Sequence, residues 1–115
     1  MLKEVQILNS KERVSAVIEG ETADRAPVVP LVGACASQFV DFSVEECLKD
    51  PQKQFNSLQK ALEKFDYDGI INWMDLTVEA EALGLKRSHP DHDLPSIIEH
   101  PVKDKDSLSE LEDPD

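Results

Sequence analysis

The chain has 115 residues, of which 24 are acidic and 12 basic, so its formal net charge is −12. This length fits one domain, residues 1–115, and is too short for a closed eight-stranded α/β barrel of roughly 250 residues. The charge disfavours a nucleic-acid or anionic-membrane surface, which needs clustered lysine and arginine, and no apolar run reaches the roughly 20 residues that span a bilayer.

The first predicted helix covers about residues 10–19. Asn9 and Glu12 have the spacing of a capping box, and Gly20 supplies the stop. Between them, apolar residues recur at helical spacing and predict a buried face. These residues are Val14, Val17 and Ile18.

Two extended segments, residues 27–32 and 70–74, are predicted as β-strands. The first is a short apolar run, and a run that is apolar on both faces suits a buried parallel strand. The chain between them is predicted to be helical, so the pattern is strand, helix, strand, typical of a right-handed βαβ unit. The sequence therefore predicts an α/β fold.

The helix between these strands has the clearest pattern in the chain. Asp50 is a suitable N-cap and Pro51 is favoured at the first helical position, while Ser43 with Glu46 predicts a short helical turn before it. An apolar stripe at spacings of three and four predicts the face that packs into the core. Its members are Phe55, Leu58, Leu62 and Phe65.

A loop of small residues follows the first predicted strand. Ligands of parallel α/β folds bind at the carboxyl ends of strands, and small side chains allow close approach, so this loop is a candidate binding site. A plain connecting loop is the alternative. Cys35 lies in it, and a lone cysteine is more often a small apolar residue than a nucleophile. The candidate binding residues are Gly33, Ala34, Cys35, Ser37 and Gln38.

The C-terminal quarter offers weaker signals. Residues 77–84 predict a short helix with a glycine stop, and residues 85–88 an extended piece. Two histidines and two carboxylates in residues 89–93 could bind a metal, but Pro90 and the acidic surroundings favour an exposed turn. Cys35 and Cys47 form neither a disulfide framework nor a zinc motif. With no N-terminal apolar stretch, a cytoplasmic location is expected.

Several phrases, in this order and at this spacing, resemble the N-terminal part of the uroporphyrinogen decarboxylase superfamily. The nearest branch by resemblance is the methylcobamide:coenzyme M methyltransferases. The phrases are SKERV (10–14), EG (19–20), DRAPV (24–28), FDYDGI (65–70), DLTVEAEALG (75–84), LPSI (94–97) and HPV (100–102).

The resemblance implies a fold larger than this chain. Superfamily members are TIM (β/α)8 barrels about three times as long, so these residues would supply the N-terminal portion, incomplete in this chain, with the first two barrel strands. Unpaired strand edges would then need the missing C-terminal portion or self-association to cover them. The chain alone is expected to be catalytically inactive.

The two branches imply different chemistry. The methyltransferases use zinc to activate a thiol and take a methyl group from a corrinoid protein, so zinc and cobamide are possible cofactors of a complete enzyme. Their zinc ligands lie later in the barrel, so no metal ligand is assigned to this chain. Decarboxylases have an arginine-rich loop after the first strand, whereas residues 33–38 contain no arginine. This departure counts against porphyrinogen decarboxylation.

Asp75 matches the decarboxylase aspartate that binds the pyrrole N–H groups, which makes it the candidate catalytic residue. An ordinary helix N-cap is an equally good interpretation. Three functions are therefore weighed: corrinoid-dependent methyl transfer to a thiol, porphyrinogen decarboxylation with Asp75 as the central contact, and a truncated, non-catalytic interaction domain.

Overall fold

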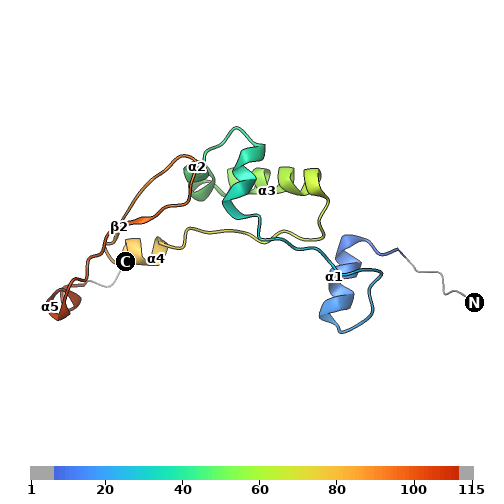
Figure 1. Ribbon diagram of the computed structural model, residues 1–115, viewed down its shortest axis with the longest axis horizontal. Coiled ribbons are helices and arrows are strands. Elements are labelled where there is room, and N and C mark those ends of the chain that lie inside the picture. The colour runs from blue at the N-terminus through green and yellow to red at the C-terminus, as the bar shows by residue number, and fades with distance from the viewer. Residues whose placement is uncertain (1–6, 112–115) are drawn as a thin grey trace, which may run out of the picture.

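The computed structural model of the protein describes residues 7–111 and is elongated, with extents of 74 × 34 × 21 Å (Figure 1). Strands β1 and β2 pair antiparallel and form the one sheet of this described part. The elements in chain order are α1 (Ser10–Ile18), the 3-10 helix η1 (Gly33–Phe39), α2 (Val44–Lys49), α3 (Pro51–Phe65), α4 (Val78–Ala82), β1 (Lys86–Arg87), β2 (Ile97–Glu99) and α5 (Lys105–Leu108).

The helix starts predicted from capping residues are confirmed. Asn9 and Glu12 form the capping box of α1, and Ser43 and Glu46 form that of α2. Asp50 accepts hydrogen bonds from two backbone N–H groups at the start of α3. These side chains satisfy donors that have no partner inside a helix, which is why the local sequence determines the helix starts.

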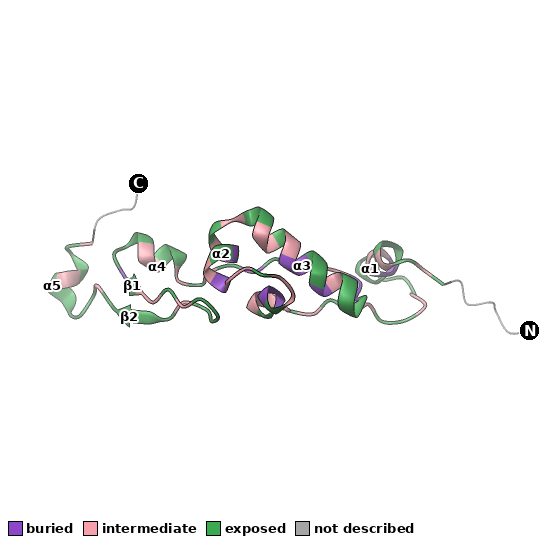
Figure 2. Ribbon diagram, turned by 90° about the horizontal axis from the view of Figure 1, so that it is seen from above, coloured by how far each residue is buried: buried purple, intermediate pink, exposed green. Residues whose placement is uncertain are grey.

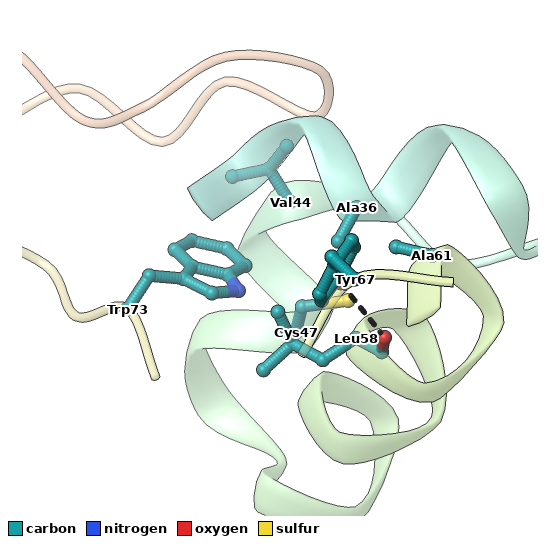
Figure 3. Packing of buried hydrophobic residues seen from close by; sticks show 7 residues of the cluster. All are labelled: Ala36, Val44, Cys47, Leu58, Ala61, Tyr67 and Trp73. Carbon is teal, nitrogen blue, oxygen red and sulfur yellow. Dashed lines mark hydrogen bonds between the residues drawn. The ribbon is translucent and has the colours of Figure 1, made fainter. Parts of the chain in front are cut away.

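The core is formed where η1 and α2 pack on one face of α3 (Figure 3). Tyr67 and Trp73, from the segment after α3, close it. Of the predicted stripe on α3, Leu58 is buried and Leu62 half-buried. The buried members of the core are Ala36, Val44, Cys47, Leu58, Ala61, Tyr67 and Trp73.

Burial of the two phenylalanines at the ends of the stripe was wrongly predicted. Phe55 is 54% exposed and Phe65 56% exposed. The helices that pack on α3, η1 and α2, are short and leave both of these side chains more than half exposed. Phe65 instead makes an edge-to-face contact with Phe39, at 5.5 Å between ring centroids.

The buried face of α1 also differs from the prediction. Val17 and Ile18 are 47% and 80% exposed, whereas Arg13 and Ala16 are buried. The reason is that Arg13 of α1 forms buried ion pairs with Asp24 and with Asp68, which follows α3, so this face is held by charge rather than by an apolar stripe. Figure 2 shows how burial varies along the molecule. Buried residues lie at α1, α2 and α3, whereas the residues of β2 and α5 are mostly exposed.

Residues 27–32 and 70–74 are extended but form no strand ladder within residues 7–111. The prediction that they are β-strands is therefore not confirmed. Both segments run in the same direction away from α1, the first into η1 and the second toward α4 (Figure 1). One backbone hydrogen bond lies at the start of this pair, from the N–H of Asp68, two residues before the second segment, to the Val28 carbonyl at 2.7 Å. A strand needs neighbours along its whole length to satisfy its backbone groups, and here each segment has the other at one end only.

Asp68 anchors this junction. Its carboxylate accepts hydrogen bonds from the Val28 N–H at 2.8 Å, from Arg13 at 2.5 Å and from Arg25 at 2.6 Å. Its side chain has no exposed surface. The hydrogen bond from Val28, followed by that from Arg25, holds the pKa of Asp68 well below its usual range. Asp24 completes the cluster through a 2.7 Å ion pair with Arg13.

The C-terminal part adds an antiparallel pair that the sequence did not predict. The extended piece expected at 85–88 is β1, and its partner β2 lies where no strand was expected. The helix predicted at 77–84 is α4, followed by Gly84 at φ +91°. No helix among residues 7–111 is both long enough and apolar enough to cross a membrane.

Candidate functional site

An open cavity of about 1210 Å³ lies between the residues that follow the first extended segment, the start of α2 and a loop near residue 92. Three separate parts of the chain therefore form its walls. Its lining residues are Val32, Gly33, Ala34, Cys35, Ser37, Gln38, Val40, Asp41, Phe42, Ser43, Glu46, Asp91, His92, Asp93 and Leu94.

The first wall is the segment predicted to bind ligands. It forms the 3-10 helix η1 rather than an open loop, and Gly33 at φ +56° turns the chain into it. Cys35 is exposed, whereas Ser37 is buried and donates its hydroxyl to the Ala34 carbonyl at 2.8 Å. All five predicted binding residues, including Gln38, line the cavity. Their role in binding stays a prediction.

The second wall is the loop 91–94, which contacts the start of α2. The Val44 N–H donates to the Asp91 carbonyl at 2.7 Å. Two side chains just before this loop reach the same carboxylate on α2. His89 Nδ1 lies 2.8 Å from Glu45 Oε1, and Arg87 Nη1 lies 3.4 Å from Glu45 Oε2. Glu45 therefore holds the loop that closes one side of the cavity.

Glu45 stays ionised over a wide pH range. The hydrogen bond from Lys49 acts against the effect of burial, and together with the contacts from His89 and Arg87 it lowers the pKa of Glu45 to about 2. The carboxylate can thus accept hydrogen bonds from its neighbours at neutral pH. Glu45 and Arg87 were not among the predicted site residues, since they meet only through a contact between distant parts of the chain.

Asp75 does not line this cavity. Its Oδ1 accepts hydrogen bonds from the Thr77 N–H at 2.8 Å and the Thr77 hydroxyl at 2.6 Å. Its Oδ2 lies 3.3 Å from Arg87 Nη1. Arg87 also pairs with Glu81 at 2.7 Å. Asp75 therefore accepts local hydrogen bonds just before α4, and it also forms an ion pair with Arg87.

The cavity is acidic. Asp41, Glu46, Asp91 and Asp93 contribute carboxylates to its lining, and no lysine or arginine is among the described lining residues. Only Glu46 has a basic partner, Lys53 at 2.5 Å. Such a lining favours neutral or cationic ligands over polyanionic ones.

The histidine-containing turn has no arrangement for a metal. Across residues 7–111, no group of three or more His, Cys, Asp and Glu side chains is placed to hold one. His89 instead pairs with Glu45, and Asp91, His92 and Asp93 are exposed.

A model of the uroporphyrinogen decarboxylase family matches residues 9–115. The chain belongs to the uroporphyrinogen decarboxylase family. This family implies a TIM-barrel fold, while the described part of the present chain is rich in helix and has one small sheet. No curated protein and no solved structure matches it. The family match supports the resemblance at superfamily level and does not separate its methyltransferase-like branch from its other members.

Proposed function

We propose that this uroporphyrinogen decarboxylase family chain supplies the first two strands of a TIM barrel, with residues 27–32 and 70–74 as those strands. The family match, the shared direction of the two segments and the hydrogen bond from Asp68, just before the second segment, to Val28 support this proposal. The helices between them, η1, α2 and α3, occupy the place of a crossover connection. The remaining strands would come from further polypeptide, called here the completing polypeptide.

We further propose that the assembled enzyme transfers a methyl group from a corrinoid protein to a thiol. The acidic cavity is the observation that carries this choice. A porphyrinogen is a polycarboxylate, and a pocket for it needs basic side chains. Residues 33–38 contain no arginine, and the wall formed by Asp91 and Asp93 adds negative charge. A neutral or cationic group meets no such repulsion.

The contacts of Asp75 also favour methyl transfer over decarboxylation. A porphyrinogen would need this carboxylate to accept its pyrrole N–H groups, yet Thr77 and Arg87 already engage both oxygens. In this scheme zinc is bound by the completing polypeptide, as the resemblance to the methyltransferases implies, and cobamide is carried by the corrinoid partner. The part of this chain would be to shape the pocket through η1 and loop 91–94.

The test combines this chain with the completing polypeptide, zinc, methylcobalamin and a thiol. We expect loss of the cobalt–methyl absorbance only when zinc and both polypeptides are present, and no activity from this chain alone. Decarboxylation of a porphyrinogen without metal, in the same preparation, would contradict the proposal.

Two matched variants test whether the negative charge of the cavity wall is what disfavours a polycarboxylate ligand. Asp91→Asn combined with Asp93→Asn removes two exposed carboxylates from the cavity wall. We expect uroporphyrin, a stable polycarboxylate probe, to bind the variant at least about threefold more tightly, because exposed charges interact through a high dielectric. Asp106→Asn in α5 with Glu110→Gln is the control, with the same change in net charge away from the cavity. Equal gains in both variants would show that only total charge matters.

A further inference from the structure

The cavity wall formed by residues 91–94 belongs to the connection between β1 and β2, which together make a β-hairpin. Ser88 and Ser96 tie the base of this connection, because the Ser88 N–H donates to the Ser96 carbonyl at 2.9 Å. Beyond this base the chain leaves the sheet and reaches the start of α2 (Figure 1). We call residues 89–94 the lid.

The lid is held against α2 by polar contacts. None of its residues is buried, so it contributes no side chain to the core. The Val44 N–H donates to the Asp91 carbonyl at 2.7 Å, and His89 Nδ1 lies 2.8 Å from Glu45 Oε1. Exposed polar contacts are individually weak, so a segment held in this way can open while the core stays folded.

His89 is the partner in these contacts whose charge changes near neutral pH. A histidine ordinarily exchanges its proton between about pH 5 and 8. Glu45 stays ionised across this range, because the hydrogen bond from Lys49, with the contacts from His89 and Arg87, lowers its pKa to about 2 against the effect of burial. The contact is therefore an ion pair when His89 is protonated, and a hydrogen bond to a neutral ring when it is not.

Glu45 keeps other partners when the lid moves away. Lys49 of α2 lies 2.8 Å from the same carboxylate oxygen, and Arg87 of β1 lies 3.4 Å from the other one. Arg87 in turn pairs with Glu81 of α4 and with Asp75. Lysine and arginine stay protonated throughout this pH range, so opening the lid leaves no unpaired carboxylate at Glu45. The other titratable groups of the lid are Asp91, His92 and Asp93.

We propose that residues 89–94 form a pH-sensitive lid on the cavity, which closes on α2 when His89 is protonated and opens as His89 loses its proton. Protonation makes the contact with Glu45 a charge-assisted hydrogen bond, which is stronger than a neutral one. A neutral ring can still donate one N–H, so the lid loosens by degrees. The inference concerns the shape of the cavity and is independent of the reaction that the assembled enzyme performs.

The backbone amide of Val44 reports the position of the lid. Val44 is the first residue of α2, so its N–H has no partner inside the helix and depends on the Asp91 carbonyl. Hydrogen exchange of the full chain, divided by the intrinsic exchange rate at each pH, gives the protection of this amide. We expect at least about threefold greater protection at about pH 5.5 than at about pH 8. The amide of Leu58, in the core helix α3, should be equally protected at both.

Variants of the two lid histidines locate the sensor. His89→Gln keeps a side-chain N–H donor but removes the charge, and should leave Val44 at the lower protection at both pH values. His89→Arg carries a permanent charge, and should keep the higher protection at both. His92→Gln is the matched control, because His92 lines the cavity but is not among the described ion-pair partners of Glu45. It should keep the full difference.

Each outcome decides for or against the lid. Equal protection of Val44 at the two pH values in the unchanged chain would overturn the proposal. A difference that survives His89→Gln, or that disappears in His92→Gln, would do the same, because His89 would not be the sensor. A parallel change at Leu58 would show that the core unfolds, and would contradict a local opening.

Discussion

Asp68→Asn is expected to release α1 from the rest of the chain. The substitution removes a carboxylate with no exposed surface that holds Arg13, Arg25 and the Val28 N–H. Arg13 is 5% exposed and would keep only part of its ion pairing, through Asp24. Losing one partner of a buried ion pair is strongly destabilising, so we expect the melting temperature to fall by about 10 °C or more.

Amide hydrogen exchange separates the local from the global effect. The amides of α1 should exchange much faster in Asp68→Asn, while those of α3 change less. Asp66→Asn is the matched control, because Asp66 is exposed and adopts a left-handed conformation, φ 49°, that asparagine tolerates. Equal effects of the two variants would contradict the anchoring role of Asp68.

The same cluster predicts sensitivity to acid. Because the folded state holds the pKa of Asp68 below its unfolded value near 3.8, its stabilisation is fully present above that pH. It is lost as pH falls further, toward the folded pKa. Asp24, whose pKa is lowered by its hydrogen bond from Arg13, acts in the same direction. Asp68→Asn should therefore show a weaker loss of stability below about pH 4 than the unchanged chain.

Leu58→Ala is expected to destabilise the core by about 2–5 kcal/mol. Leu58 is 4% exposed and lies where α3 meets α2 and η1, so a cavity would remain among Ala36, Val44 and Cys47 (Figure 3). Trp73, the single tryptophan of the chain, belongs to this core and reports unfolding in urea by fluorescence.

Phe55→Ala is the control for the core. Phe55 belongs to the same predicted stripe but is 54% exposed, so its truncation should cost less than about 1 kcal/mol. A loss of stability equal to that of Leu58→Ala would mean that the whole stripe is buried, as the sequence predicts, and that the end of α3 has a cover that the structure does not show.

The starts of three helices could be predicted correctly from short-range signals in the sequence. Asn9, Ser43 and Asp50 cap the helices they were predicted to cap, because capping involves residues only two or three positions apart. Burial depends on which elements meet, and the stripe could not reveal that short neighbours leave Phe55 and Phe65 open.

The candidate site was predictable only in part. The five residues predicted from their position after an extended segment all line the cavity; they are Gly33, Ala34, Cys35, Ser37 and Gln38. The second wall depends on the contact of Glu45 with Arg87 and His89, more than 40 positions apart. No spacing rule links residues so distant, and Asp75 could be placed beside Arg87 only from the structure.

The central claim is that residues 27–32 and 70–74 are neighbouring parallel strands of a barrel. Amide exchange and inter-strand NOEs, measured on this chain with and without the completing polypeptide, test it most directly. The account predicts NOEs that advance in the same direction from the Val28–Asp68 contact, and at least about hundredfold slower exchange of amides 29–31 and 70–72 on assembly. Antiparallel NOEs, or exchange that assembly leaves unchanged, would contradict it.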